Sequence, residues 1–454
     1  MGAKGLPSVA AVTLGCKLNY SETSAILDRL SAEGWRISSV EKGADMIIIH
    51  TCAVTKQAEQ KCRQKIRQLV KRNPSSAIVV IGCYAQLQPL RLSGIEGVHG
   101  VLGSNDKFRT DIYREIFDAK PEPPFVQVSD PCAADEIHAG YSLPENSGAA
   151  RTRAFLKIQD GCDYGCAYCT IPLARGRSRS LPAAMLVERA HALAASGYRE
   201  IVLTGVNIGD YRSEGTGLSG LLLMLDRVAL DRIRVSSLEP DILDDRLLDV
   251  VACSRKIAPH FHVPLQSGSD RVLHAMGRRY TTAGYRERIM RAMESIPDCA
   301  IGIDVIAGYP GESEEDFQDM YRFIGELPAA YLHVFSCSLR PGTRLASQTS
   351  SGERKPLSSR EIERRSGMLI DLGRKKKSAY TAGFLGKERK VLVETCTRDG
   401  SGVLCCSGYT ANYLQVTAEA EGFAGDPDRL KGALLPVAIR EMDRDLNLQG
   451  RLLF

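Results

Sequence analysis

Short apolar runs alternate with longer amphipathic stretches between about residues 154 and 340 of this chain. The amphipathic stretches have helical spacing, for example over 183–195 and 314–326. Repeated strand–helix units predict a parallel sheet with helices on its outside, curled into a barrel. A complete eight-unit barrel needs about 250 residues, and this stretch is shorter, so we expect a partial (βα)6 barrel. The six expected strands are 155–158, 200–203, 233–236, 261–263, 301–306 and 331–335.

The regions on either side of this pattern divide the chain into further domains. Strand-like and helical runs also alternate near the start, which predicts an N-terminal α/β parallel-sheet domain at 7–118. Three prolines between residues 121 and 124 then open a polar, Gly-rich stretch, which indicates a linker at 119–150 with one short strand near its start. The barrel core follows at 151–380. Short β-rich runs after it predict a small all-β barrel at 381–454.

The composition indicates the cellular compartment of the protein, and the compartment determines how its cysteines are interpreted. The longest apolar runs are far shorter than the roughly 20 residues that span a bilayer, and Met1–Pro7 has no apolar signal core. We therefore expect a cytoplasmic protein without a membrane partner. The chain has 14 cysteines. Because a reducing cytoplasm disfavours structural disulfides, clustered cysteines there point to metal binding or catalysis.

The most specific motif is a group of three cysteines directly after the first expected strand of the barrel. Cys162, Cys166 and Cys169 have the spacing C-x3-C-x2-C. Three thiolates can hold three irons of a 4Fe-4S cluster and leave the fourth iron open to a small molecule. The amino and carboxylate groups of S-adenosylmethionine suit that iron. A structural zinc site needs four ligands in most cases, and no fourth cysteine or histidine lies nearby in the sequence.

A second group of three cysteines is suggested by context rather than by spacing. Cys16, Cys52 and Cys83 each close an apolar run of the N-terminal domain. In a parallel sheet the carboxyl ends of the strands share one edge, so the three side chains can converge on a shared metal site. Simple packing is the alternative, because free cysteines are often buried apolar residues. We assign packing to the other eight cysteines.

Taken together, these motifs resemble the radical SAM methylthiotransferases, and most closely those that modify N6-threonylcarbamoyladenosine in tRNA. The resemblance runs over nearly the whole chain. Its motifs are Gly15-Cys16-Lys17-Leu18-Asn19, Thr51-Cys52, Gly82-Cys83-Tyr84-Ala85-Gln86, 157–162, the C-x3-C-x2-C motif, 171–176, 237–240, 264–268 and 308–312.

The resemblance implies two 4Fe-4S clusters, one held by each group of three cysteines, and S-adenosylmethionine as a further cofactor. It also implies that the terminal domain is a small barrel of the TRAM type. The loops that follow the barrel strands are expected to line the cofactor site, although a tight turn alone would also explain Gly205. The expected cofactor contacts are Thr204, Gly205, Asn207, Glu239, Gln266 and Ser267.

For the substrate, the resemblance implies a tRNA adenosine next to the anticodon, which receives a methylthio group at C2. An external electron donor and a sulfur source are then required partners, and the oligomeric state is not predicted. Isopentenyladenosine in tRNA and an aspartate of a ribosomal protein remain alternative substrates. A cobalamin-dependent radical methylase is disfavoured because no Asp-x-His-x-x-Gly loop is present, and a non-catalytic RNA-binding protein is disfavoured by the open iron at each cluster.

Several polar residues have more than one interpretation. Arg175 closely follows the cluster motif, and we predict that its guanidinium binds the carboxylate of the threonylcarbamoyl group. His260 and His262 are interpreted as polar lining of the barrel, since no third metal ligand is evident. The terminal domain has nine Lys or Arg and ten Asp or Glu. RNA binding is therefore expected to be shared with the basic stretches 61–72 and 374–377.

Overall fold

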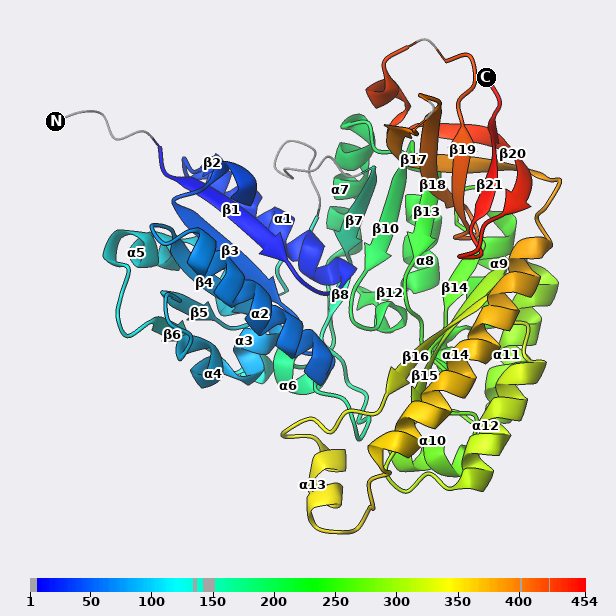
Figure 1. The fold of residues 1–454 in the computed structure, drawn as a ribbon, viewed down its shortest axis with the longest axis horizontal. Helices are drawn as coiled ribbons and strands as arrows, with labels where there is room; N and C mark the ends of the chain where they lie inside the picture. The colour runs from blue at the N-terminus through cyan, green and yellow to red at the C-terminus, as the bar shows by residue number, and fades with distance from the viewer. Residues whose placement is uncertain (1–5, 134–136, 142–151, 401, 424) are drawn as a thin grey trace.

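The computed structural model describes residues 6–133, 137–141, 152–400, 402–423 and 425–454, and it consists of three successive domains (Figure 1). The first is a parallel sheet in the order β2-β1-β3-β4-β5-β6. Its elements are β1 (Ser8–Thr13), α1 (Lys17–Ala32), β2 (Arg36–Ile37), β3 (Met46–Thr51), α2 (Lys56–Arg72), β4 (Ala77–Gly82), α3 (Cys83–Leu87), α4 (Pro89–Ser93), β5 (Gly100–Leu102), α5 (Thr110–Ala119) and β6 (Phe125–Gln127).

Burial explains why the N-terminal sheet forms. Every residue of β3 and β4 is buried, as expected for central parallel strands that are covered by helices on both faces. One correction concerns the end of this domain. β6 pairs in parallel with β5, so the sheet extends past residue 118 into the stretch that we expected to be linker. Residues 142–151 of that linker lie outside the described residues.

The second domain is the expected partial barrel. Its strands form two three-stranded parallel sheets, β7-β10-β13 and β14-β15-β16, which parallel bridges such as Ser237–His262 connect. The main elements are β7 (Arg153–Lys157), α7 (Ala183–Ala195), β10 (Glu200–Thr204), α8 (Leu218–Leu225), β13 (Arg232–Val235), α9 (Asp245–Cys253), β14 (His260–His262), α10 (Asp270–Met276), α11 (Thr282–Ser295), β15 (Ala300–Ala307), α12 (Glu314–Glu326), β16 (Tyr331–Ser336), α13 (Arg344–Ser350) and α14 (Ser359–Ala382).

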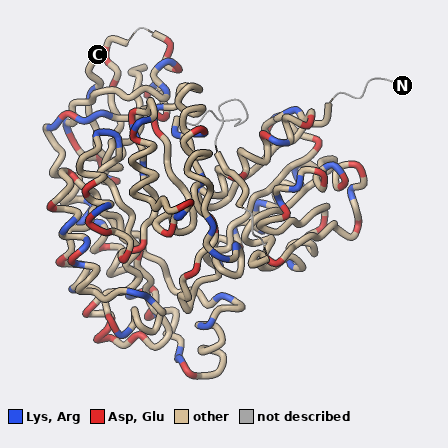
Figure 2. Tube along the Cα trace, turned by 180° about the vertical axis from the view of Figure 1, so that it is seen from behind, with Lys and Arg blue, Asp and Glu red and all other residues tan. Residues whose placement is uncertain are grey.

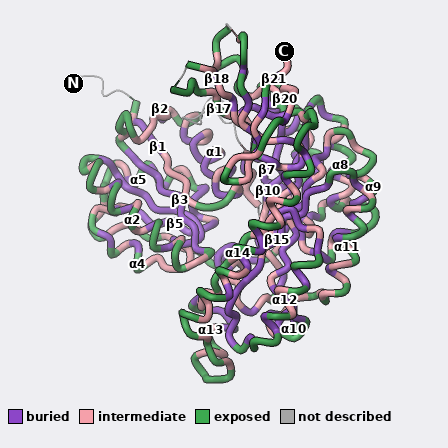
Figure 3. Tube along the Cα trace, turned by 45° about the vertical axis from the view of Figure 1, so that its right-hand side comes forward, coloured by how far each residue is buried: buried purple, intermediate pink, exposed green. Residues whose placement is uncertain are grey.

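The barrel core lies between the strands and their outer helices, where Figure 3 shows continuous burial. Short elements follow the ends of the first two strands. They are β8 (Gln159–Asp160), α6 (Ile171–Arg175), β9 (Arg179–Ser180), β11 (Arg212–Ser213) and β12 (Thr216–Gly217). Among them, α6 contacts α3 of the N-terminal domain.

The third domain is a closed five-stranded barrel with the order β17-β18-β19-β21-β20. This confirms the small all-β barrel, although β18 and β21 were not expected. Arg234 of the central barrel donates hydrogen bonds to the carbonyl oxygens of Ala411 and Thr410, at 2.9 and 3.1 Å, which ties the terminal domain to β13. The strands are β17 (Glu388–Arg398), β18 (Leu404–Thr410), β19 (Gln415–Glu419), β20 (Leu434–Met442) and β21 (Leu448–Leu452).

Charged residues are distributed over all three domains, with Lys and Arg interspersed among Asp and Glu along the chain (Figure 2). Within the described part of the chain, no helix is long and apolar enough to cross a membrane.

Candidate active site

The C-x3-C-x2-C motif forms a loop between β8 and α6, and its sulfurs accept N–H donors. The backbone N–H of Tyr164 donates to Cys162 Sγ and that of Ile171 to Cys169 Sγ, both at 3.4 Å. The guanidinium of Arg278 donates to Cys166 Sγ at 3.1 Å. Burial raises the pKa of the Cys162 thiol to about 11 and that of Cys169 to about 12. Such thiols are protonated near neutral pH unless a metal group binds them.

The spacing of the sulfurs fits a cluster better than a single ion. Among the described residues, neither group of three cysteines has its sulfurs all within 4.8 Å of one another. A single tetrahedral zinc ion bonds each sulfur at about 2.3 Å, so it needs its ligands closer together than that. A 4Fe-4S cluster places each thiolate on a different iron, which allows the sulfurs to stand further apart.

The other three cysteines converge at the carboxyl edge of the N-terminal sheet. Cys52 follows β3, Cys83 follows β4, and Cys16 lies just beyond β1. Burial raises the pKa of Cys52 to about 12, and the nearby Cys83 and Cys16 add to the rise. Cys62 belongs to the packing instead, because its thiol donates to the carbonyl oxygen of Cys52 at 3.6 Å.

Two glycines allow the strand ends to approach each other. Gly15 has φ +118°, and a Cβ there would lie 2.7 Å from Cys52 Cβ. Gly82 has φ +98°, and a Cβ there would lie 2.8 Å from the carbonyl oxygen of Thr51. Both the left-handed backbone and the close contacts exclude a larger residue at these positions. These glycines therefore let the cysteine-bearing loops pack together.

Arg175 belongs to the central domain and contacts the N-terminal domain. This corrects our prediction that it binds the substrate carboxylate. Its guanidinium donates to Glu22 and Asp160 at 3.0 and 2.9 Å. It also donates to Asn19 Oδ1 at 3.0 Å and to Cys83 Sγ at 3.2 Å. The side chain is only 2% exposed. Because its N–H groups are engaged by the protein itself, Arg175 has a structural role between the domains.

A buried ion network surrounds this contact. Glu22 accepts hydrogen bonds from Lys107 and Lys157, each at 2.7 Å, as well as from Arg175. Burial alone would raise the pKa of Glu22, but these three cations together hold it well below its usual range. Asp160 also pairs with Lys157, at 2.6 Å. Burial opposes ionisation of Asp160, but the charges of Arg175 and then Lys157 lower its pKa to about 2. The network joins α1 of the first domain to the cluster-motif region of the second.

The expected contact residues after β10 lie in a tightly packed loop. Gln159 Oε1 accepts the backbone N–H groups of Val206 and Asn207, at 3.0 and 2.9 Å. A Cβ at Gly205 would lie 2.8 Å from the carbonyl oxygen of Gln159, so the glycine is required there. Thr204 is buried at the end of the strand, and Asn207 Oδ1 is buried without a hydrogen-bond partner among the described residues.

Glu239, Gln266 and Ser267 lie at the same end of the barrel. Glu239 pairs with Arg278, the residue that also donates to Cys166. Gln266 has φ +65°. Ser267 is fully buried, and its hydroxyl accepts the backbone N–H of Ser269 at 3.3 Å.

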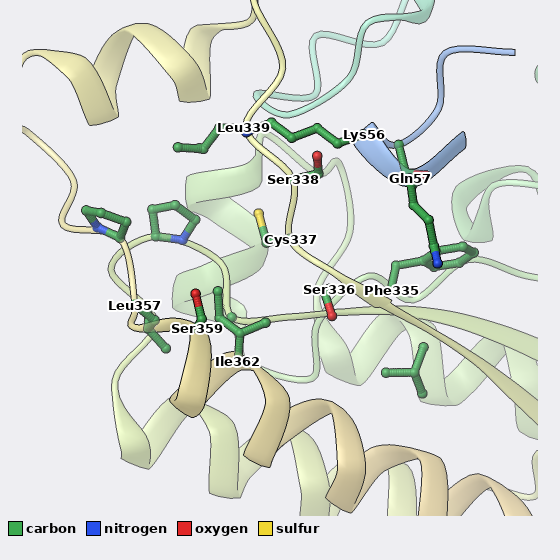
Figure 4. A pocket seen from close by; sticks show the side chains of 15 residues that line it. Lys56, Gln57, Phe335, Ser336, Cys337, Ser338, Leu339, Leu357, Ser359 and Ile362 are labelled. Atoms are coloured by element: carbon green, nitrogen blue, oxygen red, sulfur yellow. The ribbon is translucent and has the colours of Figure 1, made fainter. Parts of the chain in front are cut away.

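A cavity of 180 Å³ is lined by residues that neighbour both groups of cysteines in the sequence. Val54 and Thr55 follow Cys52, Tyr168 lies between Cys166 and Cys169, and Gln266 is an expected cofactor contact; all four line the cavity. Five of its lining residues, including Thr55 and Cys337, also line a neighbouring cavity of 590 Å³ (Figure 4). Residues next to both cysteine sites therefore line the same cavity at the junction of the domains.

The sequence did not identify Asp304 and His333 as partners of His262. His262 Nε2 is 2.8 Å from Asp304 Oδ1, and His333 Nδ1 is 3.1 Å from the same oxygen. Ser237 Oγ lies 2.8 Å from the other ring nitrogen of His262. Strand spacing could have placed His262 inside the barrel, but the pairing of β14, β15 and β16 was needed to reveal its partners.

Comparison with known proteins agrees with this arrangement. Residues 8–103 match the uncharacterized protein family UPF0004, and residues 156–324 match the Radical SAM superfamily. The threonylcarbamoyladenosine tRNA methylthiotransferase MtaB of Bacillus subtilis is 36% identical, over 96% of this chain and 94% of that protein. The tRNA-2-methylthio-N(6)-dimethylallyladenosine synthase of Chloroherpeton thalassium is 32% identical, over 84% of each chain.

A solved structure gives the same fold at low identity. The radical S-adenosylmethionine methyltransferase TsrM from Kitasatospora setae, with cobalamin and a 4Fe-4S cluster bound, superposes with a TM-score of 0.56 at 16% identity. The match covers 76% of this chain and 78% of that one. Fold and site thus define a radical SAM enzyme, which uses S-adenosylmethionine and a 4Fe-4S cluster. More narrowly, the chain belongs to the radical SAM methylthiotransferase family.

Proposed function

We propose that this enzyme converts N6-threonylcarbamoyladenosine next to the anticodon of tRNA to its 2-methylthio derivative. The observation that carries the proposal is the shared cavity, whose lining comes from the loop after Cys52, from the C-x3-C-x2-C loop and from Gln266. One cysteine site can start the radical reaction while the other holds the group to be transferred. The names of the MtaB relatives support the choice of substrate.

The residues around each cysteine site suit an iron–sulfur cluster. Cys162, Cys166 and Cys169 would hold the radical SAM cluster, which supplies the electron that cleaves S-adenosylmethionine when both are bound. Arg278 places a positive charge beside Cys166 Sγ. Cys16, Cys52 and Cys83 would hold a second 4Fe-4S cluster, and Arg175 donates to Cys83 Sγ there.

We assign the cofactor contacts to the loops at the carboxyl ends of the barrel strands. Gly205 permits the close approach of its loop to Gln159. Asn207 Oδ1 has no hydrogen-bond partner among the residues that the structure describes, so it is a buried acceptor for a donor group of S-adenosylmethionine. Gln266 reaches the shared cavity directly. Thr204, Glu239 and Ser267 support these loops from buried or paired positions.

The partners follow from the reaction. The substrate is an unpaired anticodon-loop base, which can be exposed more easily than a base within a helix. An external electron donor and a sulfur source complete the cycle, and we place the enzyme in the cytoplasm with its tRNA substrate. The terminal barrel, which we assign to the TRAM type, would share RNA binding with the basic helix α2.

Iron content and product analysis test this function. Anaerobic reconstitution should give about eight irons per chain, four for each cluster. Replacing Cys162, Cys166 and Cys169 together by Ala should remove about half of them and leave the N-terminal cluster. Four irons in the unchanged protein would contradict the second cluster.

The substrate is tested separately. The reconstituted enzyme is given tRNA bearing N6-threonylcarbamoyladenosine or tRNA bearing isopentenyladenosine under identical reducing conditions, and the nucleosides are analysed by mass spectrometry. The first should gain a methylthio group and the second should not. Equal modification of both would contradict the substrate while leaving the reaction class in place.

A further inference from the structure

Lys17 lies where all three domains meet. It is the first residue of α1 and directly follows Cys16. Its ammonium group is 5.5 Å from the ring centroid of Tyr413, which belongs to the terminal barrel. Arg234 and Arg153 of the central barrel lie at the same ring, with Cζ at 4.8 and 5.9 Å from the centroid. Three cations from two domains thus surround one aromatic side chain of the third.

The charges at this junction are not balanced. Arg153 pairs with Glu394 at 2.7 Å. Glu200 is shared between Arg232 and Arg234, each at 3.0 Å. Lys17 forms no ion pair with a carboxylate of any residue that the structure describes. The junction therefore holds two more cations than carboxylates, and Lys17 is the cation that remains available to an anion from outside.

Aromatic side chains continue from this junction into the barrel. The His260 ring lies 4.7 Å from that of Tyr413, and His260 Nε2 is 2.8 Å from the hydroxyl of Tyr331. Tyr331 and Tyr413 also line a cavity of 280 Å³ together with His333 and Tyr409. Planar side chains of this kind are suited to stacking with an unpaired nucleobase.

We propose that Lys17 binds the carboxylate of the threonylcarbamoyl group of the RNA substrate. This inference rests on the proposed function. The group to be transferred would be held beside Cys16, and Lys17 is the next residue, so its ammonium can reach a substituent of the base that is being modified. Arg175, the cation that donates to Cys83 Sγ, is occupied by Glu22, Asp160 and Asn19, and Arg278, which donates to Cys166 Sγ, pairs with Glu239.

The test compares one RNA with and without the negative charge. An anticodon stem-loop carrying N6-threonylcarbamoyladenosine is compared with the same RNA as its carboxylate methyl ester, and binding to the reconstituted enzyme is measured anaerobically by fluorescence anisotropy. The wild-type enzyme should prefer the free acid by about 10- to 100-fold, which is typical of one hydrogen-bonded charge. Lys17→Met should bind both RNAs with nearly equal affinity, whereas Lys17→Arg should keep most of the preference.

Lys42→Met is the matched control, because it removes one exposed lysine charge from the same domain. It should keep the wild-type preference. Variants are compared at equal iron content, and Lys17→Gln replaces Lys17→Met if the latter loses iron. An unchanged preference in the Lys17 variant would overturn the inference. Equal weakening of both RNAs would also overturn it, because Lys17 would then bind a phosphate.

The outcome also separates this inference from the proposed function. If the wild-type enzyme shows no preference for the free acid and does not modify that RNA, the proposed substrate is wrong. If the wild-type enzyme prefers and modifies it but Lys17→Met does so equally, only the role of Lys17 is wrong.

Discussion

The two cysteine sites have neighbouring residues that line the same cavity, but the chain assembles the two sites in different ways. Cys162, Cys166 and Cys169 belong to one loop, and two of their three N–H donors come from backbone in or next to that loop. Cys16, Cys52 and Cys83 come from three separate strand ends, and the donor to Cys83 is Arg175 of the other domain. The first site depends mainly on local sequence, whereas the second depends on how two domains pack.

Because of this difference, the N-terminal site depends on more of the surrounding structure than the barrel site does. Its environment includes buried charges that are stable only as a complete network, because an unpaired charge in the interior is costly. Lys107 and Glu22 are both fully buried. The network therefore maintains the contact between the domains as well as the surroundings of Cys83.

We expect the largest loss of stability from a substitution of Glu22, which lies at the centre of this ion network. Glu22→Gln removes the carboxylate that three cations share, so Lys157 and Arg175 would keep only Asp160, and Lys107 would lose the carboxylate with which it pairs. Removing one partner of a buried ion pair typically costs about 3–5 kcal/mol. We expect a free energy of unfolding lower by that amount in urea denaturation of the apo-protein, together with loss of iron from the N-terminal site.

Asp118→Asn is the control for this experiment. Asp118 pairs with Arg114 at 3.3 Å on the surface of the same domain, and both side chains are more than half exposed. Such a pair contributes about 0–1 kcal/mol, so stability and iron content should hardly change. A similar loss in both variants would show that the buried network has no special role.

At the barrel site we expect a smaller loss of stability and a change in the reduction potential of one cluster. Arg278→Met removes the donor to Cys166 Sγ and leaves Glu239 without its partner. The loss of hydrogen bonds to charged groups should lower stability by about 1.5–3 kcal/mol. The reduction potential of the radical SAM cluster should become more negative, since a positive charge beside its sulfur is removed.

Arg279→Met serves as the matched variant. Arg279 is exposed and stacks over Tyr164, with Cζ 4.0 Å from the ring centroid, but it does not contact a cluster sulfur. Its removal should leave the potential, measured by EPR-monitored redox titration, close to that of the wild type. Equal shifts in both variants would mean that general charge, rather than the Arg278 contact, sets the potential.

The contrast between structure set by local sequence and structure set by distant contacts also explains what the sequence could predict. The strands of the central barrel were expected within one or two residues of their observed ends, because each is a short run rich in apolar residues between helical stretches. β18, in contrast, contains Cys405, Cys406 and Gly408, and its alternating burial became evident only from the paired strands on either side. β6 was expected as a strand, but its place in the sheet required knowledge of β5.

Within the site, the sequence predicted the local motifs, but it did not predict contacts between residues that are far apart in the chain. The C-x3-C-x2-C loop could be recognised from its spacing alone. The role of Arg175 was predicted incorrectly because its partners Asn19 and Glu22 are more than 150 positions away in the chain. The grouping of His262 with Asp304 and His333 likewise depends on strand pairing, which the sequence of one strand does not contain.

The smallest difference that we predict between a variant and its matched control concerns the backbone that brings the N-terminal cysteines together. Gly82→Ala must adopt φ +98° and place a Cβ 2.8 Å from the carbonyl oxygen of Thr51 and 2.5 Å from the ring of His50. Gly43→Ala also requires a positive φ, +78°, but its Cβ would meet nothing within 4 Å. Both variants should lose about 1–2 kcal/mol for the left-handed backbone.

The difference between these two variants isolates the close packing beside Cys83. Gly82→Ala should lose about 1–2 kcal/mol more than Gly43→Ala, because the neighbouring backbone cannot move away from the added methyl group. Only Gly82→Ala should lower the iron content of the N-terminal site, while the barrel site keeps its four irons in both proteins. Urea denaturation and iron analysis of the two variants measure this directly. Equal stability losses with full iron content would mean that the strand ends tolerate displacement, and that the N-terminal site depends on the ion network alone.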